Sequence, residues 1–439
     1  MNCLLKPRTP SAHHGSTVAL AIAAWLLLAG GRPGVLAADD EWCETQVIRA
    51  QDARHPALVD VGGDLVLFWV GDPVVATGRY CPLFPVCGPP PAAQSIQTVQ
   101  WPLSWVDLTK YQGKIMKSAG SARLALANGG SVYARLAMAG NGRDLIVVHP
   151  RHMYDSKAGT EAVVYRVSTN EEATWPLAIA KALAGPPLTA LPYSLPSVRA
   201  SSRAPPPDSD AAKWFIYHVK EDKDFSRLDV CGDGEGSGYY LCGEDHVAET
   251  IWVTHSHDGE TWRDPLALAQ GAGFPAIAAR GQRVIVTYTD AGEFTYQVIW
   301  PDDRPRSDKF FWPPAGSLKY RLSEDGGKTW GEPKTLIERK EAISSRCVWA
   351  PDGTIWVAYV KSLGGTSALC LASSRDEGRT WTEPQQITTS KRTDRDPEIA
   401  IWRGKVVVAF SRCLRPGGWD NIWLWQHEAN VTTDRAQTE

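Results

Sequence analysis

Apolar residues along this chain fall into short runs that come in pairs, with a glycine and a polar neighbour between the two runs of each pair. The pattern occurs six times, in residues 56–70, 131–149, 196–219, 275–288, 346–360 and 397–411. Short apolar and β-branched runs bounded by glycine or proline are typical of buried strands. We therefore expect six hairpins, each made of two buried strands.

A polar pattern that ends in tryptophan also repeats. Residues 323–330 read SEDGGKTW and residues 374–381 read SRDEGRTW, so both match S-x-D-x-G-x-T-W. The Asp can accept hydrogen bonds from N–H groups of its own turn, the Gly permits positive φ, and the Trp offers a large apolar surface to neighbouring strands. Weaker copies occupy residues 168–175 and 256–262. The residues that we expect to build these turns are Asp258, Asp325, Asp376, Trp175, Trp262, Trp330 and Trp381.

The hairpins and the turns together predict the architecture. A third apolar run leads into each motif, at 163–166, 251–254, 318–322 and 369–372, and a fourth leaves it near a tryptophan. Repetition of a four-stranded unit is typical of β-propellers. We expect an all-β chain with six four-stranded antiparallel blades and the motif turns on one rim. The long loops at 71–98, 150–160, 220–249, 289–317 and 412–420 would lie on the other rim.

The first residues have the layout of an export signal. Lys6 and Arg8 precede an apolar run at 18–29, and small residues at 35–37 offer a cleavage site before Ala38. The run is short for a membrane span, and no later segment approaches about 18 apolar residues. We expect residues 1–37 to be a signal peptide and residues 38–439 to be one propeller domain. The protein would then be secreted or periplasmic, with a retained membrane anchor as the alternative.

The cysteines are consistent with an oxidising compartment. The chain has nine, and one of them, Cys3, lies in the predicted signal peptide. An even number of cysteines in an exported protein favours disulfides. We predict two local bridges, Cys81–Cys87 and Cys231–Cys242. For the other four, disulfide bonding and burial as free thiols stay open; they are Cys43, Cys347, Cys370 and Cys413.

The net charge and the motifs of the chain limit the kinds of ligand and partner that the sequence predicts. The formal net charge is -3 and no basic run stands out, so the sequence does not predict a nucleic-acid or anionic-membrane partner. The Gly-rich stretch 232–238 lacks the Gly-Lys-Ser/Thr of a phosphate loop and is read as a flexible loop. We expect no metal and no cofactor.

These features resemble the sialidase (neuraminidase) superfamily over nearly the whole mature chain, and in that family the tryptophan motif is the Asp box, or BNR repeat. The resemblance implies a six-bladed propeller that acts on sialylated or other acidic glycans. In the family an Arg-hydrophobic-Pro motif opens the first inner strand, and its Arg is one of three that bind the substrate carboxylate. Arg54, His55 and Pro56 match this motif, with His in place of the usual aliphatic residue. Arg54 is therefore a candidate substrate-binding residue.

Register argues for a pair of cations independently of the family. Arg54 lies nine residues before Gly63, and Arg395 lies nine residues before Gly404. If the sixth blade closes on the first, the two arginines are neighbours. Guanidinium groups side by side repel unless they share an anion, and a carboxylate suits their forked geometry. Arg346, two residues later in register, is a third candidate for substrate binding.

Internal ion pairing is the alternative for these arginines. Acidic side chains stand nearby in the sequence at Asp52, Asp396 and Glu398. A guanidinium paired with them would serve the fold instead of a substrate. The sequence leaves both interpretations open.

The catalytic groups that the resemblance implies are only partly matched. Retaining sialidases use a Tyr nucleophile beside a Glu, and an Asp on a loop of the first blade as acid/base. Asp72 follows the second predicted strand and is the candidate Asp, and Tyr288 with Glu293 is the candidate nucleophile pair. Trp419 stands near the position where the family carries its Tyr.

Three functions follow, in this order. The first is a secreted glycoside hydrolase of the exo-α-sialidase type that acts on sialylated or other acidic glycans. The second is a catalytically silent Asp-box propeller that binds glycans or a protein. The third is a polyuronate lyase, for which Arg151, His152 and Tyr154 are available. Tyr154 with Asp155 is also an alternative nucleophile pair, while substrate linkage and oligomeric state stay open.

Overall fold

The computed structural model describes strands from the compact unit Trp42–Glu439. Apart from the 3-10 turn η1 (Leu108–Lys110), the named elements of the described residues are strands, so the all-β class is confirmed. The predicted signal peptide lies outside the described residues. These are 43–48, 54–61, 63–70, 74–75, 99–110, 120–126, 137–140, 144–152, 160–168, 178, 189–192, 227–236, 238–245, 250–291, 297–299, 310–312, 315–364, 366–389, 392–413 and 420–428.

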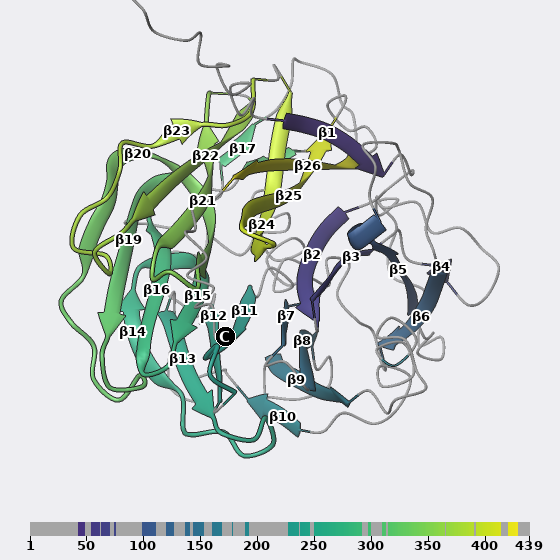
Figure 1. Cartoon of the computed structure of the whole chain (residues 1–439), viewed down its shortest axis with the longest axis horizontal. Coiled ribbons are helices and arrows are strands. Elements are labelled where there is room, and N and C mark those ends of the chain that lie inside the picture. The colour runs from purple at the N-terminus through teal and green to yellow at the C-terminus, as the bar shows by residue number, and fades with distance from the viewer. Residues whose placement is uncertain are drawn as a thin grey trace, which may run out of the picture. The chain divides into compact units, whose positions relative to one another are not determined.

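After β1, the chain forms three separate antiparallel sheets in turn (Figure 1). The first sheet holds β2 (Arg54–Val61), β3 (Asp64–Val70), β4 (Val74–Val75), β5 (Val99–Asp107) and β6 (Gly120–Leu126). The second holds β7 (Ala137–Gly140), β8 (Asp144–His152), β9 (Thr160–Ser168) and β10 (Thr189–Pro192). The third holds β11 (Leu228–Gly232), β12 (Tyr239–Asp245), β13 (Thr250–Ser256) and β14 (Leu266–Gln270).

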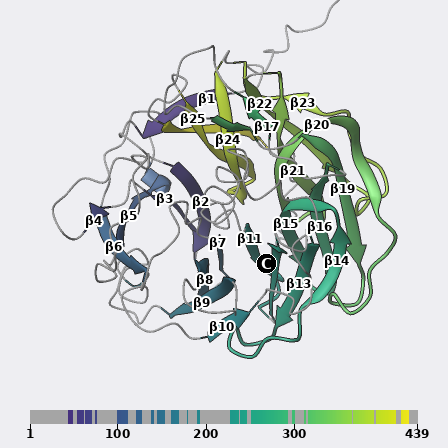
Figure 2. The same cartoon turned by 180° about the vertical axis from the view of Figure 1, so that it is seen from behind.

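The remaining strands form one sheet of 11 strands, in which successive groups of antiparallel strands, called here sheet units, are joined edge to edge. One reason is that β20 is 16 residues long, pairing with β19 near its start and with β21 near its end. Figures 1 and 2 show these strands side by side from two directions. The strands are β15 (Ala272–Arg280), β16 (Arg283–Asp290), β19 (Gly316–Ser323), β20 (Lys334–Trp349), β21 (Ile355–Ser362), β22 (Ser367–Ser374), β23 (Gln385–Gln386), β24 (Thr393–Trp402), β25 (Lys405–Cys413), β26 (Asp420–Glu428) and β1 (Cys43–Ile48). Two further strands, β17 (Gln297–Ile299) and β18 (Phe310–Trp312), pair only with each other among the described strands.

Five of the six predicted hairpins coincide with paired strands. They are β2–β3, β7–β8, β15–β16, β20–β21 and β24–β25. The runs predicted to lead into the tryptophan motifs lie in β9, β13, β19 and β22. Every residue of β13 and β22 is buried. Because both faces of these strands are covered, their sequences do not alternate between apolar and polar residues.

The third predicted hairpin and one predicted loop need correction. Residues 196–219 lie outside the described residues, and the described hairpin before the motif at 256–262 is β11–β12. Residues 220–249 are therefore not one long loop. The Gly-rich stretch that suggested a loop is the hairpin connection, in which Gly234 and Gly236 have φ of 72° and 75° and Asp233 N donates to Gly238 O at 3.1 Å.

The tryptophan motifs at 256–262, 323–330 and 374–381 share one hydrogen-bonded turn, called here the box turn. In the second, Asp325 Oδ1 accepts from Lys328 N at 3.0 Å and Thr329 N at 2.9 Å. Trp330 Nε1 donates to Gly327 O at 3.2 Å, and Gly327 has a φ of 76°. Hydrogen bonds from Thr329 lower the pKa of Asp325 to about 2, because they stabilise the carboxylate.

Box turns also hold neighbouring sheet units together. Gly259 lies against Ile146 of β8, and a Cβ at this glycine would stand 2.6 Å from Ile146 Cδ1. The hydroxyl group of Tyr320 in β19 donates a hydrogen bond of 2.8 Å to Gly378 O, which lies in the box turn at 374–381. The tryptophans of these turns are half-buried against the cores of the sheets; these are Trp262, Trp330 and Trp381. Trp175, in the first predicted motif, lies outside the described residues.

The first strands of the successive units lie next to one another. β2 contacts β7, β7 contacts β11, β11 contacts β15, β15 contacts β20, β20 contacts β24, and β24 contacts β2. In Figure 1, β2, β7, β11, β15 and β24 occupy the inner side of their sheets. Residues near the start of each of these strands can therefore meet across sheet boundaries.

The N-terminal strand completes the C-terminal sheet unit. β1 pairs antiparallel with β26, beside β25 and β24. Arg412 of β25 is buried, donates from Nη2 to Asp394 Oδ2 at 2.8 Å and also pairs with Glu44 of β1. A buried ion network thus ties the two ends of the described chain together.

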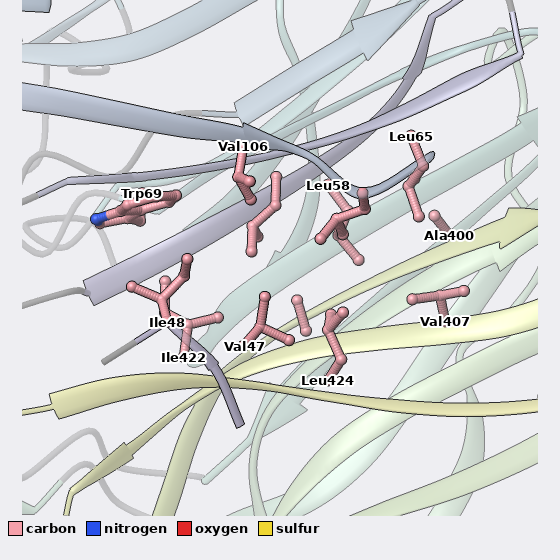
Figure 3. Packing of buried hydrophobic residues seen from close by; sticks show 13 residues of the cluster. Val47, Ile48, Leu58, Leu65, Trp69, Val106, Ala400, Val407, Ile422 and Leu424 are labelled. Atoms are coloured by element: carbon pink, nitrogen blue, oxygen red, sulfur yellow. The ribbon is translucent and has the colours of Figure 1, made fainter. Parts of the chain in front are cut away.

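A hydrophobic cluster fills the boundary between the first and last units (Figure 3). Trp402 packs against it and donates from Nε1 to Gly63 O at 3.0 Å, which links β24 to the β2–β3 turn. Burial of this apolar surface is the main stabilising contribution at the boundary. The buried members are Val47, Ile48, Leu58, Leu65, Leu67, Trp69, Val106, Leu108, Ala400, Val407, Ala409, Ile422 and Leu424.

Candidate functional site

Three of the inner strands begin with the same unusual backbone. His55, Phe274 and Asp396 have φ of 48°, 58° and 51°, and each directly precedes a proline. Each also sits where the pairing register shifts, between Arg54 and Ala57, Gly273 and Ala276, and Arg395 and Glu398. Non-glycine residues rarely adopt positive φ, and such strain gathers at functional sites. The starts of β2, β15 and β24 are therefore the place to look for a site.

Two of these residues touch across the boundary between β2 and β24. His55 Nδ1 lies 3.3 Å from Asp396 Oδ2. The residues directly before them are Arg54 and Arg395, the two arginines that register pairs in the sequence. Arg54 is described as part of β2, but its side chain lies outside the description. The backbone thus brings the two candidate positions to neighbouring strand ends.

Arg395 is the more open of the described arginine side chains at this place. Its side chain is 43% exposed, and its Nε lies 4.0 Å from Asp396 Oδ2, at the outer limit for an ion pair. The guanidinium of Arg395 is thus partly exposed to solvent. Bidentate contact with a carboxylate is the interaction that this group makes best.

Arg346 is in a different environment, because it is buried among carboxylates. Its Nε lies 2.9 Å from Glu398 Oε1 and 3.7 Å from Asp229 Oδ1, while Nη1 donates to the carbonyl oxygen of Pro275 at 3.3 Å. Burial by itself lowers the pKa of Arg346, but Asp229 and Glu398 outweigh it, and the pKa is raised. Nη2 has no hydrogen-bond partner among the described residues.

Arg346 links strands of different sheet units through these contacts. Asp229 comes from β11, Pro275 from β15, Arg346 from β20 and Glu398 from β24. One guanidinium faces two carboxylates, so the group carries a net negative charge. A substrate carboxylate would gain less here than beside Arg395, since it would approach two like charges. The contacts of Arg346 thus match the alternative in which an arginine pairs with internal carboxylates instead of a substrate.

Arg227 also lies beside an inner strand, and the sequence pattern did not single it out. It directly precedes β11, and its guanidinium carbon lies 3.5 Å from the centroid of the Phe274 ring. Phe274 is itself held by its N–H, which donates to Glu244 Oε2 at 2.8 Å. In the sequence, the segment 220–249 has the composition of a loop, so Arg227 has no predicted strand start with which its position can be compared.

The candidate catalytic residues are only partly described. Asp72 and Glu293 lie outside the described residues. Tyr288 is buried in β16, where burial raises its pKa although Arg321 acts in the opposite direction. A raised pKa disfavours the phenolate form that attacks a sugar. Tyr154 lies outside the described residues, as do the side chains of Arg151 and His152.

The predicted Cys231–Cys242 disulfide is wrong, since both residues carry free thiols. The pairing register gives the reason. Cys231 stands opposite Tyr240, and Cys242 stands opposite Asp229, so the two cysteines are diagonal rather than facing. Diagonal neighbours lie roughly 7–8 Å apart, beyond the usual reach of a disulfide. Burial raises the pKa of both thiols.

The other cysteine predictions have mixed outcomes. Cys347 and Cys370 are buried free thiols, which is the second of the two alternatives left open for them. Cys81, Cys87 and the side chain of Cys43 lie outside the described residues. The Cys81–Cys87 bridge stays a prediction.

Metal and membrane features are absent from the described part of the chain. No three His, Cys, Asp or Glu side chains lie together there as metal ligands would. Nor does that part contain a helix long and apolar enough to cross a membrane.

Comparison with known proteins gives structural similarity alone. No protein-family model matches the chain, and no curated protein matches it. Trypanosoma rangeli sialidase with the inhibitor DANA has a TM-score of 0.49 at 11% identity, covering 86% of this chain and 55% of that one. Hadza microbial sialidase Hz136 has a TM-score of 0.47 at 11% identity, covering 86% and 66%. A Dyadobacter fermentans protein of unknown function has 0.46 at 11%, covering 88% and 97%.

The chain spans 55% of the length of the trypanosomal enzyme that it resembles. Similarity of this degree concerns the fold and carries no information on activity.

Proposed function

We propose that residues 38–439 form a six-bladed β-propeller of the sialidase type, exported by a signal peptide at residues 1–37. The support is twofold. Contacts between the first strands of the six units run from β2 through β7, β11, β15, β20 and β24 and return to β2. The box turns at 256–262, 323–330 and 374–381 share the hydrogen bonding expected of Asp boxes, for example Gly378 N to Ser374 Oγ at 2.8 Å.

The proposed function is recognition and hydrolysis of an acidic glycan, with the sugar carboxylate bound by Arg54 and Arg395. The observation that carries it is the 3.3 Å contact between His55 and Asp396. Because each of these residues directly follows one of the arginines, the contact supports a pair of cations on neighbouring strand ends. Such a pair is stabilised by a shared carboxylate. Arg227, over Phe274, is a further candidate for this site.

Asp72 is the proposed acid/base for hydrolysis, since it stands in the sequence directly after β3, between β3 and β4 of the first sheet. A Tyr would be the nucleophile, as in retaining sialidases. The burial of Tyr288 favours a second candidate function, in which the same arginines bind acidic glycans without turnover. The two functions share the carboxylate site and differ in chemistry.

Calorimetric titration tests the shared site. Sialic acid and glucuronic acid should bind. Neutral analogues of the same size should bind at least about tenfold more weakly. Arg395→Lys should weaken binding of the acids by about 1.5–3 kcal/mol without lowering the thermal midpoint, because Lys keeps the charge and loses the fork. Arg375→Lys, on the exposed surface of a box turn, is the matched control. Equal affinity for acidic and neutral sugars would count against a carboxylate site.

Release of a fluorophore from an α-sialoside separates the two functions. Turnover that disappears in Asp72→Asn supports the hydrolase. Binding of sialic acid without turnover in the wild-type protein supports the silent glycan-binding propeller.

A further inference from the structure

The carboxylate of Asp396 lies between a titratable ring and an arginine. Its Oδ2 is 3.3 Å from His55 Nδ1 and 4.0 Å from Arg395 Nε. Both side chains of the His55–Asp396 pair are mostly buried, with 18% and 13% exposed. Asp396 therefore stands where it affects any anion that approaches Arg395.

We propose that Asp396 competes with the ligand carboxylate at this site and that protonation of His55 relieves the competition. Acidic sugars would then bind more tightly at acid pH than at alkaline pH. The inference rests on the carboxylate binding proposed above and adds to it a residue that sets the pH range of binding.

The electrostatics give the direction. With His55 neutral, the negative charge of Asp396 repels an incoming carboxylate and attracts Arg395. With His55 protonated, the carboxylate of Asp396 has a positively charged ring 3.3 Å away, and the local charge rises by one. A sugar carboxylate is ionised throughout this range, since carboxyl groups ordinarily titrate near pH 3–4. The ligand affinity should therefore be higher when the ring carries a proton than when it is neutral.

Two charged groups on the strands packed against His55 have partners of their own. Arg412 is held by Asp394 and Glu44, and Glu398 is held by Arg346. The strands packed against β2 are β3, β7, β24, β25 and β26, and β7 carries no ionisable residue. The ionisable residues of β2 and these strands are Arg54, His55, Asp60, Asp64, Asp394, Arg395, Asp396, Glu398, Lys405, Arg412, Cys413, Asp420, His427 and Glu428.

The backbone keeps the pair together. His55 and Asp396 both have positive φ and both precede a proline, although a residue before proline ordinarily prefers an extended conformation. The strand pairing on either side of each register shift holds this strained backbone. Asn tolerates positive φ, so Asn replacements remove the charge and leave the backbone in place.

Calorimetric titration of glucuronic acid at pH 5.5 and 8.0 tests the inference. We expect the wild-type Kd to be about tenfold lower at pH 5.5, the effect of one charge-assisted contact. His55→Asn should bind with the same affinity at both pH values. Asp396→Asn should bind tightly at both. His257→Asn, an exposed histidine on another sheet, should behave as wild type.

Persistence of the pH dependence in His55→Asn would overturn the inference while leaving the carboxylate site intact. Weaker binding by Asp396→Asn at both pH values would also overturn it, because Asp396 would then assist the ligand. Absence of acid-sugar binding in every variant would remove the proposed function itself.

A double-mutant cycle on unfolding tests the pair without any ligand. His55→Asn and Asp396→Asn should show a coupling of about tenfold in the unfolding equilibrium constant at pH 5.5 and none at pH 8.0. Coupling that is equal at the two pH values contradicts the proposed switch even if sugars bind.

Discussion

The hydroxyl group of Tyr320 donates a hydrogen bond of 2.8 Å to the carbonyl oxygen of Gly378. Tyr320 belongs to β19, and Gly378 belongs to the box turn that follows β22, so the bond joins two sheet units. The Tyr320 ring also meets Trp381 of the same box turn edge-on, with 5.4 Å between ring centroids. The box turn therefore acts between sheet units as well as within its own hairpin.

Tyr320→Phe should lower the free energy of unfolding by about 1–2 kcal/mol, because a buried carbonyl oxygen loses its donor. Urea denaturation measures the change. Tyr239→Phe is the matched control, since the Tyr239 hydroxyl group is buried and has no hydrogen-bond partner among the described residues. That substitution should be neutral or stabilising. An equal loss of unfolding free energy in the two variants would show that the hydrogen bond to Gly378 is not the source of the stabilisation.

Gly259→Ala should be more destabilising than Gly364→Ala. Both glycines have a φ of 74°, so the backbone strain of an added Cβ is about 1 kcal/mol in each. At Gly259 the Cβ would also stand 2.6 Å from Ile146 Cδ1, whereas nothing lies within 4 Å at Gly364. We expect a further loss of about 1–3 kcal/mol from overpacking at Gly259. Ile146→Val in the Gly259→Ala background should recover part of it, and a lack of recovery would place the cost elsewhere.

Asp325→Asn should change the acid sensitivity of the fold. The pKa of Asp325 is lowered to about 2 by hydrogen bonds from Thr329, below its ordinary value of 3.8. Its contribution to stability is therefore present above about pH 4 and is lost as pH falls toward 2. The variant should be less stable at pH 7 and lose less stability across that interval. Glu324→Gln, on the exposed neighbour, should leave the acid profile unchanged.

His255 should make the protein less stable in mild acid. Burial and the nearby His257 lower its pKa to about 4, so the folded state favours the neutral ring. An unfolded chain takes up the proton near pH 6.5, which means that stability is complete above that pH and declines as pH falls toward 4. Thermal midpoints of His255→Gln should fall less over this range than those of the wild type. His257→Gln should also reduce this loss in part, because His257 contributes to lowering the pKa of His255.

Arg346→Met should unfold the protein easily, because it leaves the carboxylates of Asp229 and Glu398 buried without their counterion. We expect a loss of about 3–5 kcal/mol in the free energy of unfolding. Arg395→Met should cost under about 1 kcal/mol, since that side chain is 43% exposed. Asp229→Asn with Glu398→Gln should restore stability to the Arg346→Met variant. A small effect of Arg346→Met with a large loss of sugar binding would instead make Arg346 a ligand-binding residue.

The sequence by itself determined the local elements of this protein. Apolar runs, glycine turns and the tryptophan motif identify the all-β class, five hairpins and the strands leading into the motifs, because these depend on neighbours a few residues away. The same locality explains the failures. Cys231 and Cys242 flank a Gly-rich stretch and look like a disulfide pair, yet the register of β11 and β12 sets them diagonally.

Only the tertiary structure decided what each arginine touches. Arg346 and Arg395 look alike in the sequence, but the first is buried between Asp229 and Glu398 and the second is partly exposed beside Asp396. Those partners come from β11 and β24, and no local pattern encodes which strands meet. Ion pairing depends on distance and burial in space, so the environment of each guanidinium emerges only when the sheets pack.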